Sequence, residues 1–456
     1  MGPRQVKTVE DARTIVEERG LSHVKVGITD IDGILRGKYM SKAKFFSSLE
    51  KGFGFCDVAL GWDSNDQLYD NVQITGWHTG YPDAMVRILP ESCREIPMED
   101  GMLFFLGEFY GKHETVCPRA TLRRVIDKAS DMGYDVFAGL EYEFFLFEET
   151  PHSVREKNYK DLRLLQPGNF GYSLIRTSTE SDFYQEMLSA CELLDIPIEG
   201  LHEETGPGVM EAALTVDNGL SAGDKACLFK TFAKVIAQKH GLMATFMAKW
   251  SPDYPGQSGH IHMSLQRKDG SGGAFHDVSK PGNISDEMRY FLGGQQQLMP
   301  QVLAMIASTV NSYTRLIPGF WAPTDASWGM DNRTTALRGI SGSTNSQRVE
   351  YRIAAADANP YLALAASIGS GLWGIENKIE PGAETIGSAY DVKFPKKLQL
   401  PRTLIDAAEN LSACKPAREL FGDEFVDHFA ATREWEQREY QKHISDWEME
   451  RYFEII

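Results

Sequence analysis

The sequence predicts an α+β protein built from two unequal parts, and three observations lead to that prediction. Short strand-like runs fill the first 112 residues. Beyond them, helical stretches alternate with strand-like runs that carry acidic residues. A length of 456 residues, of which 42% are hydrophobic, allows a large core beside a smaller one. We therefore expect a small α+β domain over residues 1–112 and a larger domain over residues 113–456.

The small part begins with a predicted β-hairpin. The segment from Val24 to Lys38 alternates around Asp30-Ile31-Asp32-Gly33, a sequence typical of a hairpin turn. Three further short strands are expected at Asp57–Leu60, Ala84–Ile88 and Met102–Glu108.

The larger part is expected to open with a helix from Pro118 through Met132 that ends at Gly133. Further helices are predicted at residues 222–240 and 285–307, and residues 422–456 form a charged helical stretch. The polar segment Pro151–Gln166 is expected to be a surface loop. Strands are predicted at Tyr134–Phe147, Val209–Val216, Leu242–Ala248, Gly259–Gln266 and Arg348–Ile353.

Charge and composition exclude several classes of protein. A net charge of -17 argues against nucleic acid or an anionic membrane as a partner. No apolar run approaches the roughly 20 residues of a spanning helix, and the first residues do not resemble a signal peptide. The six cysteines are widely spaced without a Cys-x-x-Cys pair, which is typical of reduced thiols in a cytoplasmic protein.

Two acids stand out in the predicted strand Tyr134–Phe147. Strand geometry would place Glu141, Glu143, Phe145 and Phe147 on one face. Two carboxylates on a half-buried face are costly unless a cation pairs with them. A metal site is therefore one interpretation, and a solvent-facing strand edge is the other.

Other potential ligands follow in short phrases. Glu203 and Glu211 bracket a tight turn at Gly206-Pro207-Gly208 that can bring both carboxylates together. His260 and His262 alternate on a predicted strand, although one of them could be a core histidine. The predicted metal ligands are Glu141, Glu143, Glu203, Glu211, His260 and Glu350. Such oxygen-rich ligation suits Mg²⁺ or Mn²⁺.

Arginines flank these acids in the last third of the chain, at Arg315, Arg333, Arg338, Arg348 and Arg352. Surface arginines beside acids are common and usually contribute little. Metals and arginine forks together, however, are what phosphoryl transfer from ATP requires, because both neutralise phosphate charge.

Taken in order, these phrases resemble the glutamine synthetase family from about Val26 to the C-terminus. The phrases are Leu140–Phe144, Glu203–Glu211, Ser258–Ser264, Asn311–Gly319, Arg348–Arg352 and Asp357–Tyr361. The resemblance implies an N-terminal β-grasp-type domain over residues 1–112 and a catalytic domain over residues 113–456 with a curved antiparallel sheet. It also implies two or three divalent cations per site, ATP as co-substrate, and a dodecamer of two stacked hexameric rings.

The resemblance also implies roles for single residues. His260 would be the imidazole ligand of the metal, and His262 and Ser264 would lie near the nucleotide phosphates. Arg333, Arg338 and Arg348 would contact ATP. Gly256, Arg315 and Arg352 would hold glutamate and the acyl phosphate. In the assembled ring, the loop Cys56–Asp63 would be donated to the site by a neighbouring subunit.

The chain departs from glutamine synthetase where that enzyme binds ammonium. Trp321 occupies the position of a flap glutamate, and Cys56 and Ala59 stand where an acid and a serine are usual, although a one-residue slip would bring in Asp57. Val209 replaces a usual glutamine. An ammonium ion needs polar ligands to offset its desolvation. The predicted amine pocket, more apolar than an ammonium site, consists of Cys56, Ala59, Trp62, Asp63, Tyr172 and Trp321.

This pattern resembles the γ-glutamylamide synthetases, which join glutamate to a primary amine at the expense of ATP. We expect an apolar alkyl or aromatic amine, with Asp63, Asp57 or Tyr172 as the base and Arg315 and Arg352 stabilising the transition state. Trp321 could instead be a core aromatic, which would leave glutamine synthetase as an alternative. A γ-glutamylpolyamine synthetase and a non-catalytic relative are further alternatives.

Overall fold

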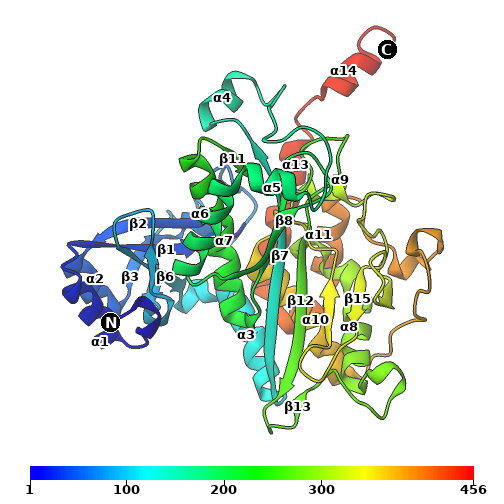
Figure 1. Cartoon of the computed structure of the whole chain (residues 1–456), viewed down its shortest axis with the longest axis horizontal. Coiled ribbons are helices and arrows are strands. Elements are labelled where there is room, and N and C mark those ends of the chain that lie inside the picture. Colours follow the sequence, from blue (N-terminus) through cyan, green and yellow to red (C-terminus); the bar gives the residue numbers. More distant parts are fainter.

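The computed structural model describes all residues, 1–456, and contains two sheets of unequal size. Figure 1 shows the smaller sheet with its helices at one side, in blue, against a larger body built around the long strands β7 and β12. The buried hydrophobic residues form one cluster of 23 centred on the smaller sheet and one of 85 centred on the larger sheet, and the larger cluster also includes Phe104 and Leu106 of β6. One face of β6 therefore packs against the larger part of the chain.

The smaller sheet has the strand order β2-β1-β6-β4-β3, with β5 paired to β6. Strands β1 and β6 run parallel and their neighbours antiparallel. The predicted hairpin is confirmed as β1 and β2. The elements are α1 Val9–Glu18, β1 His23–Thr29, β2 Leu35–Ser41, α2 Lys42–Lys51, β3 Phe53–Cys56, β4 Asp83–Ile88, β5 Arg94–Ile96 and β6 Met102–Phe109.

The strand predicted at Asp57–Leu60 is wrong, because these residues form a 3-10 helix. The pairing of β3 with β4 ends at Cys56 opposite Asp83, so the next residues have no strand to pair with. Asp57 instead turns inward, where it accepts a hydrogen bond from Thr75 Oγ1 (2.8 Å) and lies 3.3 Å from His113 Nε2. The loop that follows is thereby fixed from inside.

The larger sheet has the order β14-β15-β16-β12-β7-β9-β8 and is antiparallel except between β14 and β15. The predicted strand Tyr134–Phe147 is confirmed without change as β7. The strands are β7 Tyr134–Phe147, β8 Ile198–Glu203, β9 Val209–Leu214, β10 Asp217–Asn218, β11 Met243–Thr245, β12 Gly259–Arg267, β13 Gly272–Gly273, β14 Trp328–Met330, β15 Leu337–Ile340 and β16 Arg348–Tyr351. It is the curved antiparallel sheet expected of the fold.

Helices α3 (Pro118–Asp131), α7 (Gly219–Lys239), α8 (Asp286–Val302) and α10 (Pro360–Asn377) pack together behind this sheet, with α3 and α7 directly against β7. On β7, Tyr142 and Phe144 face the helices and contact Phe229 of α7. Because side chains alternate along a strand, Glu141 and Glu143 face the opposite side, which is free of helices. The remaining helices are α4 Pro151–Glu156, α5 Leu174–Thr179, α6 Ser181–Leu193, α9 Ser312–Arg315, α11 Leu404–Ala413, α12 Lys415–Phe421, α13 Asp423–Tyr440 and α14 Asp446–Tyr452.

Two other predictions need correction. The strand expected at Leu242–Ala248 is only the three residues of β11. The segment Pro151–Gln166 is not all loop, because α4 occupies its first six residues. Thr150 caps that helix by accepting a hydrogen bond from the Ser153 amide, and Pro151 takes its first position. Proline and threonine at these two places are a helix-start signal that the polar composition concealed.

Buried polar contacts join the two parts of the chain. Arg433 of α13 is almost fully buried and binds Asp32 Oδ1 at 2.7 Å. Asn359 donates to the carbonyl of Ile31 at 3.0 Å, and His428 contacts the carbonyl of Leu60 through Nε2 at 2.9 Å. These pairs fix the hairpin turn and the 3-10 helix against the larger part, since a buried charge without a partner is costly. None of the helices is both long and apolar enough to cross a membrane.

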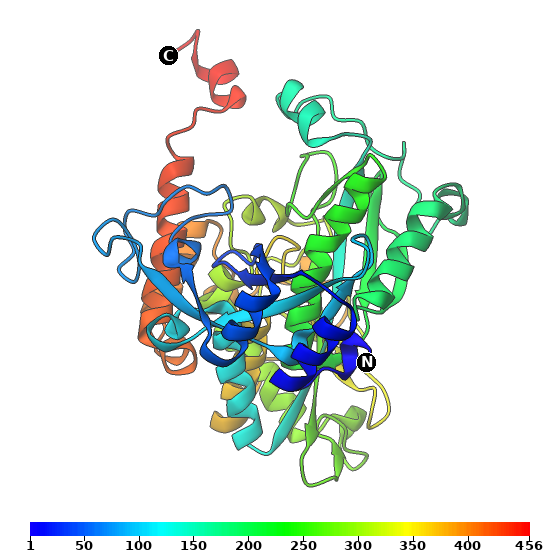
Figure 2. The same cartoon turned by 90° about the vertical axis from the view of Figure 1, so that its left-hand side faces the viewer.

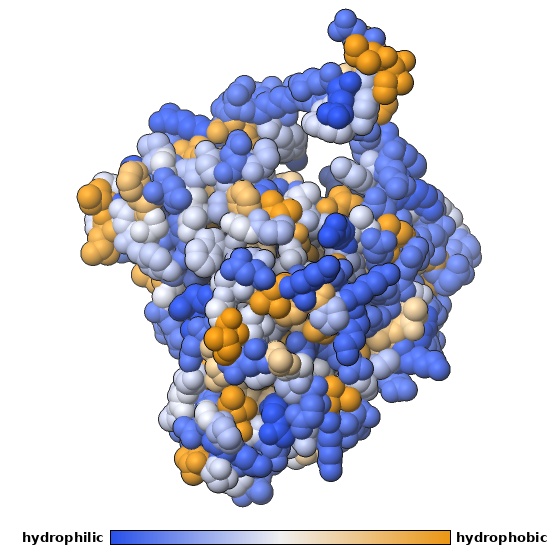
Figure 3. Space-filling model, turned by 90° about the vertical axis from the view of Figure 1, so that its right-hand side faces the viewer, coloured by the Kyte–Doolittle hydropathy of each residue, from blue (hydrophilic) through white to orange (hydrophobic).

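The chain ends in an arm that leaves the body. In Figures 1 and 2 helix α14 projects from the end of α13, and its first residue, Asp446, pairs with Lys160 at 2.8 Å. Apolar side chains are exposed along the arm, among them Ile444 at 73%, Trp447 at 58% and Phe453 at 80%. Orange surface lies on this arm at the top of Figure 3. Apolar side chains are therefore left exposed to water at this end of the chain.

Candidate active site

A polar cavity of about 490 Å³ lies on the helix-free face of the larger sheet. Strands β7, β9, β12, β15 and β16 form its wall, and loops at residues 172, 204–205, 255–258 and 320–321 form its mouth. Eight of the sequence-predicted residues on the wall line it, and they are Glu141, Glu143, Glu211, His260, His262, Arg338, Arg348 and Glu350. The register of the strands explains this convergence, because His260 lies opposite Glu141, Glu350 opposite His262, and Glu211 opposite Glu143.

One group of possible metal ligands consists of Glu141, His262 and Glu350, whose ligand atoms all lie within 4.8 Å of one another. His262 Nε2 is 3.0 Å from Glu141 Oε1. His260 Nδ1 is 3.6 Å from carboxylate oxygens of both Glu141 and Glu350. Burial alone would raise the pKa of Glu141, but hydrogen bonds from His260 and His262 bring it well below its usual range. Glu141 is therefore a carboxylate, the form that binds a metal.

Arginines hold the carboxylate of Glu350 from two sides. Arg338 Nη1 donates to its Oε2 at 3.0 Å, and Arg352 donates to its Oε1. Burial would raise the pKa of Glu350, but His260, Arg352 and His262 lower it to about 2. The two arginines must be paired in the buried wall, so the carboxylate keeps their positions fixed.

A second group of possible ligands consists of His202, Glu204 and Glu211, again within 4.8 Å of one another. His202 Nε2 lies 3.6 Å from both carboxylates and is buried without a hydrogen-bond partner. Burial raises the pKa of Glu211 to about 9, and the negative charges of Glu143 and Glu141 add to the rise. A cluster of acids that repel one another in this way is what a divalent cation would stabilise.

The structure corrects one predicted ligand. Glu203 points away from the cavity, toward Gln166 and Arg176 on the other side of β8. Its neighbour Glu204 lines the cavity in its place. In β8, His202 lies opposite Glu211, and alternation puts the next residue on the far face. Because His202 pairs with Glu211, the residue two positions after His202 returns to the cavity side, and that residue is Glu204. The eight-residue spacing around the turn pointed to Glu203 instead.

The residues present fit a site for divalent cations. Glu143 also lines the cavity, where its Oε2 accepts a hydrogen bond from the Ser258 amide at 2.7 Å. The donor set is carboxylate and imidazole with no thiolate, which suits Mg²⁺ or Mn²⁺. Six residues could hold such cations, namely Glu141, Glu143, Glu204, Glu211, His260 and Glu350.

Backbone carbonyls and a glycine hold Arg315 at the arginine side of the cavity. Arg315 is 2% exposed, and its guanidinium donates to the carbonyls of Ile353 (2.9 Å) and Arg352 (3.2 Å). Gly256 lies directly against it, since a Cβ there would meet Arg315 Cγ at 2.5 Å and the Ala248 carbonyl at 2.7 Å. Only glycine therefore allows this close approach. Arg333 completes the set of arginines at the cavity.

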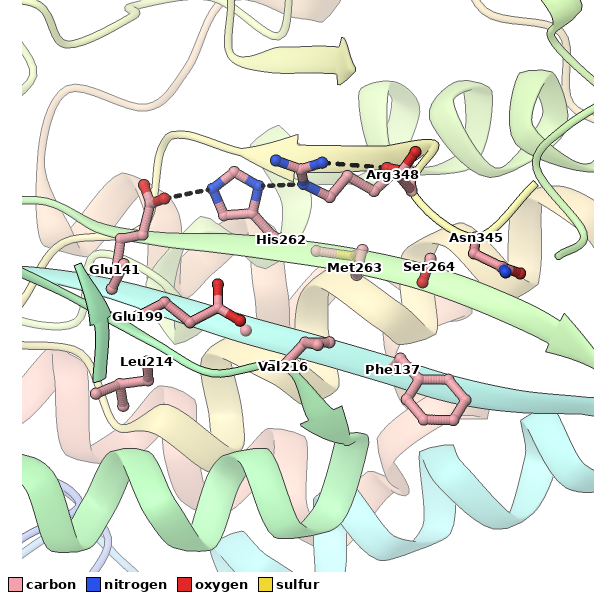
Figure 4. A pocket seen from close by; sticks show the side chains of 13 residues that line it. Phe137, Glu141, Glu199, Leu214, Val216, His262, Met263, Ser264, Asn345 and Arg348 are labelled. Carbon is pink, nitrogen blue, oxygen red and sulfur yellow. Dashed lines mark hydrogen bonds and ion pairs between the residues drawn. The ribbon is translucent and has the colours of Figure 1, made fainter. Parts of the chain in front are cut away.

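A smaller cavity of about 290 Å³ continues along β7 and β12. Figure 4 shows His262 at its upper edge, between Glu141 and Arg348. Arg348 Nε donates to His262 Nδ1 at 3.1 Å. Ser264 lines this cavity together with Glu199 and Asn345. Glu199 was not predicted from the sequence. Simple alternation along β8 would put it on the face opposite His202, and only the bulge after Ile198 brings it to the cavity side.

The mouth carries Tyr172 and Trp321, which both line the main cavity. The Tyr172 hydroxyl donates to Glu204 Oε1 at 2.7 Å, and its ring stacks on His202 at 4.7 Å. This hydrogen bond raises the pKa of Tyr172 to about 12, which makes it a proton donor rather than a base. Trp321 is 57% exposed and is not a core aromatic.

The predicted amine-pocket residues of the N-terminal part do not line the cavity of the same chain. Ala59 is fully buried, and Asp63 accepts hydrogen bonds from the amides of Asn65 and Gln67. Cys56 is exposed, and Trp62 lies under the guanidinium of Arg36 at 4.8 Å. Asp57, the alternative to Cys56, is fully buried and unavailable to a ligand.

Comparison with known proteins places this geometry among known enzymes. Residues 115–452 match the family described as glutamine synthetase, catalytic domain. The chain is 46% identical to type-1 glutamine synthetase 2 of Dictyostelium discoideum over 95% of this chain and 84% of the relative. It is 34% identical to the glutamate–isopropylamine ligase of a Pseudomonas species over the full length of both. The solved structure of apo GmaS is similar with a TM-score of 0.83 and 25% identity, over 97% of this chain and 99% of that one.

Proposed function

The chain belongs to the glutamine synthetase family and is an ATP-dependent carbon–nitrogen ligase, and we propose that it joins the γ-carboxylate of L-glutamate to a small apolar primary amine. One observation carries the proposal: Trp321 lines the mouth of a cavity whose wall carries carboxylates and arginines. A tryptophan offers an apolar surface to an alkyl or aromatic group and no ligand to ammonium. The products would be a γ-glutamylamide, ADP and phosphate.

Ligases of this family use ATP and divalent metals, and we propose that the six residues Glu141, Glu143, Glu204, Glu211, His260 and Glu350 hold two or three such ions. A bound Mg²⁺ or Mn²⁺ would neutralise charge on the transferring phosphoryl group. We assign the ATP phosphates to Arg333, Arg338 and Arg348, with His262 and Ser264 near them. Figure 4 shows three of these side chains along one cavity.

Arg315 and Arg352 would hold glutamate so that its γ-carboxylate meets the γ-phosphate of ATP. Both guanidinium groups are nearly buried and are fixed by hydrogen bonds to backbone or to Glu350. Fixed charges cost no reorganisation when the acyl phosphate forms, which is how such groups lower a barrier. The amine then attacks the acyl carbon, phosphate leaves, and one proton must pass from the amine to a base. Asp63 of a neighbouring subunit stays our candidate for that base.

The relatives support an amine ligase and also keep an alternative open. A full-length relative is named for isopropylamine, a small apolar amine of the kind that Trp321 would accommodate. A relative with higher identity is named a glutamine synthetase, so use of ammonia remains the second candidate. The acid on the mouth loops, Glu204, accepts a hydrogen bond from Tyr172 and is one of the proposed cation ligands, so it is not free to bind the far end of a polyamine.

We propose a homo-oligomer, a dodecamer of two hexameric rings, and two features support it. The arm formed by α14 leaves apolar side chains exposed, among them Trp447 and Phe453. The loop Cys56–Asp63 is anchored through the buried Asp57, and its residues lie outside the cavity of their own chain. Both features would be accounted for if neighbouring subunits cover the arm and receive the loop.

The test is ATP-dependent phosphate release with glutamate and a panel of amines: ammonia, methylamine, isopropylamine, ethanolamine, putrescine and aniline. We expect the highest kcat/KM with a small apolar amine. Preference for ammonia over every organic amine would restore glutamine synthetase, and preference for putrescine would support the polyamine alternative. Absence of phosphate release with all of them would leave only the non-catalytic relative.

A further inference from the structure

Lys249 is a buried cation that the proposed chemistry does not use. Its side chain is 7% exposed, and its Nζ has no hydrogen-bond or ion-pair partner. The favourable contact that it makes is with the ring of Phe320, whose centroid lies 4.4 Å from Nζ. Burial lowers the pKa of Lys249 for lack of a compensating acid. A cation–π contact away from water offsets part of that cost.

The backbone of Lys249 is clamped, so its side chain projects from a fixed point. The side chain of Asn311 accepts a hydrogen bond from the Lys249 amide and donates one to its carbonyl, both at 2.8 Å. Asn311 directly precedes α9, whose Ser312 is held by Asp357 at 2.9 Å. Asn311 therefore anchors both the backbone of Lys249 and the start of α9, after which the segment that contains Phe320 follows.

The segment that Lys249 contacts needs such support. Residues Leu316–Trp321 connect α9 to the buried Ala322, and Trp321 has a φ of 58°, in the left-handed region. A bulky side chain is strained there and keeps that conformation only when its surroundings impose it. Gly319, two residues earlier, has open space around it and does not impose it. The Phe320 ring, held by Lys249, is the neighbouring contact that can.

We infer that Lys249 is a positioning residue for amine selectivity: by binding the face of Phe320 it holds the segment Leu316–Trp321 over the cavity and keeps Trp321 at its mouth. The inference rests on the proposed function for its substrate, but the position of the segment does not depend on that function. Phe320 and Trp321 both line the cavity, so release of one ring moves the wall against which the amine would lie.

The experiment uses the full-length protein and the variants Lys249→Met, Lys249→Arg and Phe320→Leu. Methionine keeps the length and apolar stem of lysine but removes its charge, so the fold should persist. Without substrates, hydrogen exchange of the amides of residues 319–322 should become faster by roughly three- to thirtyfold in Lys249→Met, the range of a lost cation–π contact. Arginine also stacks on rings, so Lys249→Arg should restore slow exchange.

Lys234→Met is the matched control, because Lys234 lies 5.6 Å from the ring centroid of Phe246 and lines neither of the two cavities. We expect it to change neither exchange at residues 319–322 nor the ratio of kcat/KM for isopropylamine to that for ammonia. In Lys249→Met that ratio should fall, mainly through a higher KM for the amine. Phe320→Leu should have the same effect, and the double variant should add nothing.

Unchanged exchange at residues 319–322 in Lys249→Met, or equal acceleration in Lys234→Met, would overturn the inference. Faster exchange with an unchanged ratio of kcat/KM for isopropylamine to that for ammonia would show that Lys249 holds the segment in place but does not affect amine selectivity, which would overturn that part of the inference. If the wild type used no organic amine, the proposed function would fail, and the exchange data alone would still decide what Lys249 holds.

Discussion

The wall of the cavity and its mouth are built by different means. Wall residues such as Glu141, His260 and Glu350 stand on paired strands, and their neighbours across the sheet are fixed by register. Mouth residues such as Tyr172 and Trp321 stand on loops, both with φ of 58°. Many backbone hydrogen bonds of the sheet fix the position of a strand residue, whereas a loop residue in the left-handed region is held by a few tertiary contacts.

This difference shows which property each region controls. The wall concentrates charges that must keep their places during phosphoryl transfer, because electrostatic stabilisation requires fixed groups. The mouth has few charges to fix, so its residues can differ between relatives without disturbing the wall. We therefore expect wall substitutions to abolish the reaction and mouth substitutions to change only which amine is used.

The largest effect is expected for Glu350→Ala in the wall. The change removes a possible metal ligand and leaves Arg338 and Arg352 without their partner. Phosphate release with glutamate and amine should fall at least about a hundredfold. Glu376→Ala is the control, because Glu376 pairs with Lys128 at the surface. Chelation of divalent metals should abolish phosphate release by the wild type, and added Mg²⁺ or Mn²⁺ should restore it. Full activity of Glu350→Ala would show that Glu350 is not a metal ligand.

The next effect compares two adjacent residues at the end of β8. Glu204→Gln should lower kcat/KM by about tenfold or more and raise the Mg²⁺ concentration needed, since the carboxylate of Glu204 lies within 4.8 Å of the ligand atoms of Glu211 and His202. Glu203→Gln should change activity less than about threefold, because its side chain points to the other face. Steady-state kinetics over a series of Mg²⁺ concentrations separates the two, and a reversed order would restore Glu203 as the ligand.

At the mouth, Trp321→Glu should shift the preference for the amine substrate from isopropylamine toward ammonia, while phosphoryl transfer from ATP is kept. A carboxylate there would offer a ligand to ammonium in place of an apolar ring. The ratio of kcat/KM for isopropylamine to that for ammonia should fall about tenfold. Trp77→Glu, at an 81% exposed tryptophan elsewhere, is the control. An unchanged ratio would show that Trp321 does not contact the amine.

The smallest effect concerns the anchor of the loop Cys56–Asp63. Burial lowers the pKa of His428, which contacts the Leu60 carbonyl, to about 4 from 6.5. As the pH falls below 6.5, the unfolded chain therefore binds a proton before the folded chain does. The stability present above 6.5 is lost between 6.5 and about 4, by about 3 kcal/mol in the free energy of unfolding.

Urea unfolding of the wild type and of His428→Gln at pH 7.5, 6.0 and 5.0 measures this difference at one protein concentration. Glutamine can still donate to the Leu60 carbonyl but does not titrate, so its stability should fall less over the same interval. Parallel pH profiles of the two proteins would show that His428 titrates normally and that the loop is anchored by other contacts.

Much of the wall could be predicted from the sequence. The boundaries of β7 and the start of α3 follow from alternation and from Pro118, and five of the six predicted ligands line the cavity. The failure at Glu203 has a physical cause, because a one-residue shift in register reverses the face of every side chain in a strand. Spacing around the Gly206-Pro207-Gly208 turn cannot reveal that shift.

The sequence by itself predicted the acid-bearing strands and the kinds of ligand, since these depend on local periodicity and side-chain chemistry, and its resemblance to glutamine synthetase implied the antiparallel sheet. Tertiary structure alone decided that Glu204 and Glu199 line the cavities, because a bulge after Ile198 and pairing with β9 set the faces of β8. It also decided the place of Trp321 and the burial of Lys249 beneath Phe320. A left-handed backbone and an unpaired buried charge are unfavourable locally, so only the contacts of the folded chain can hold them.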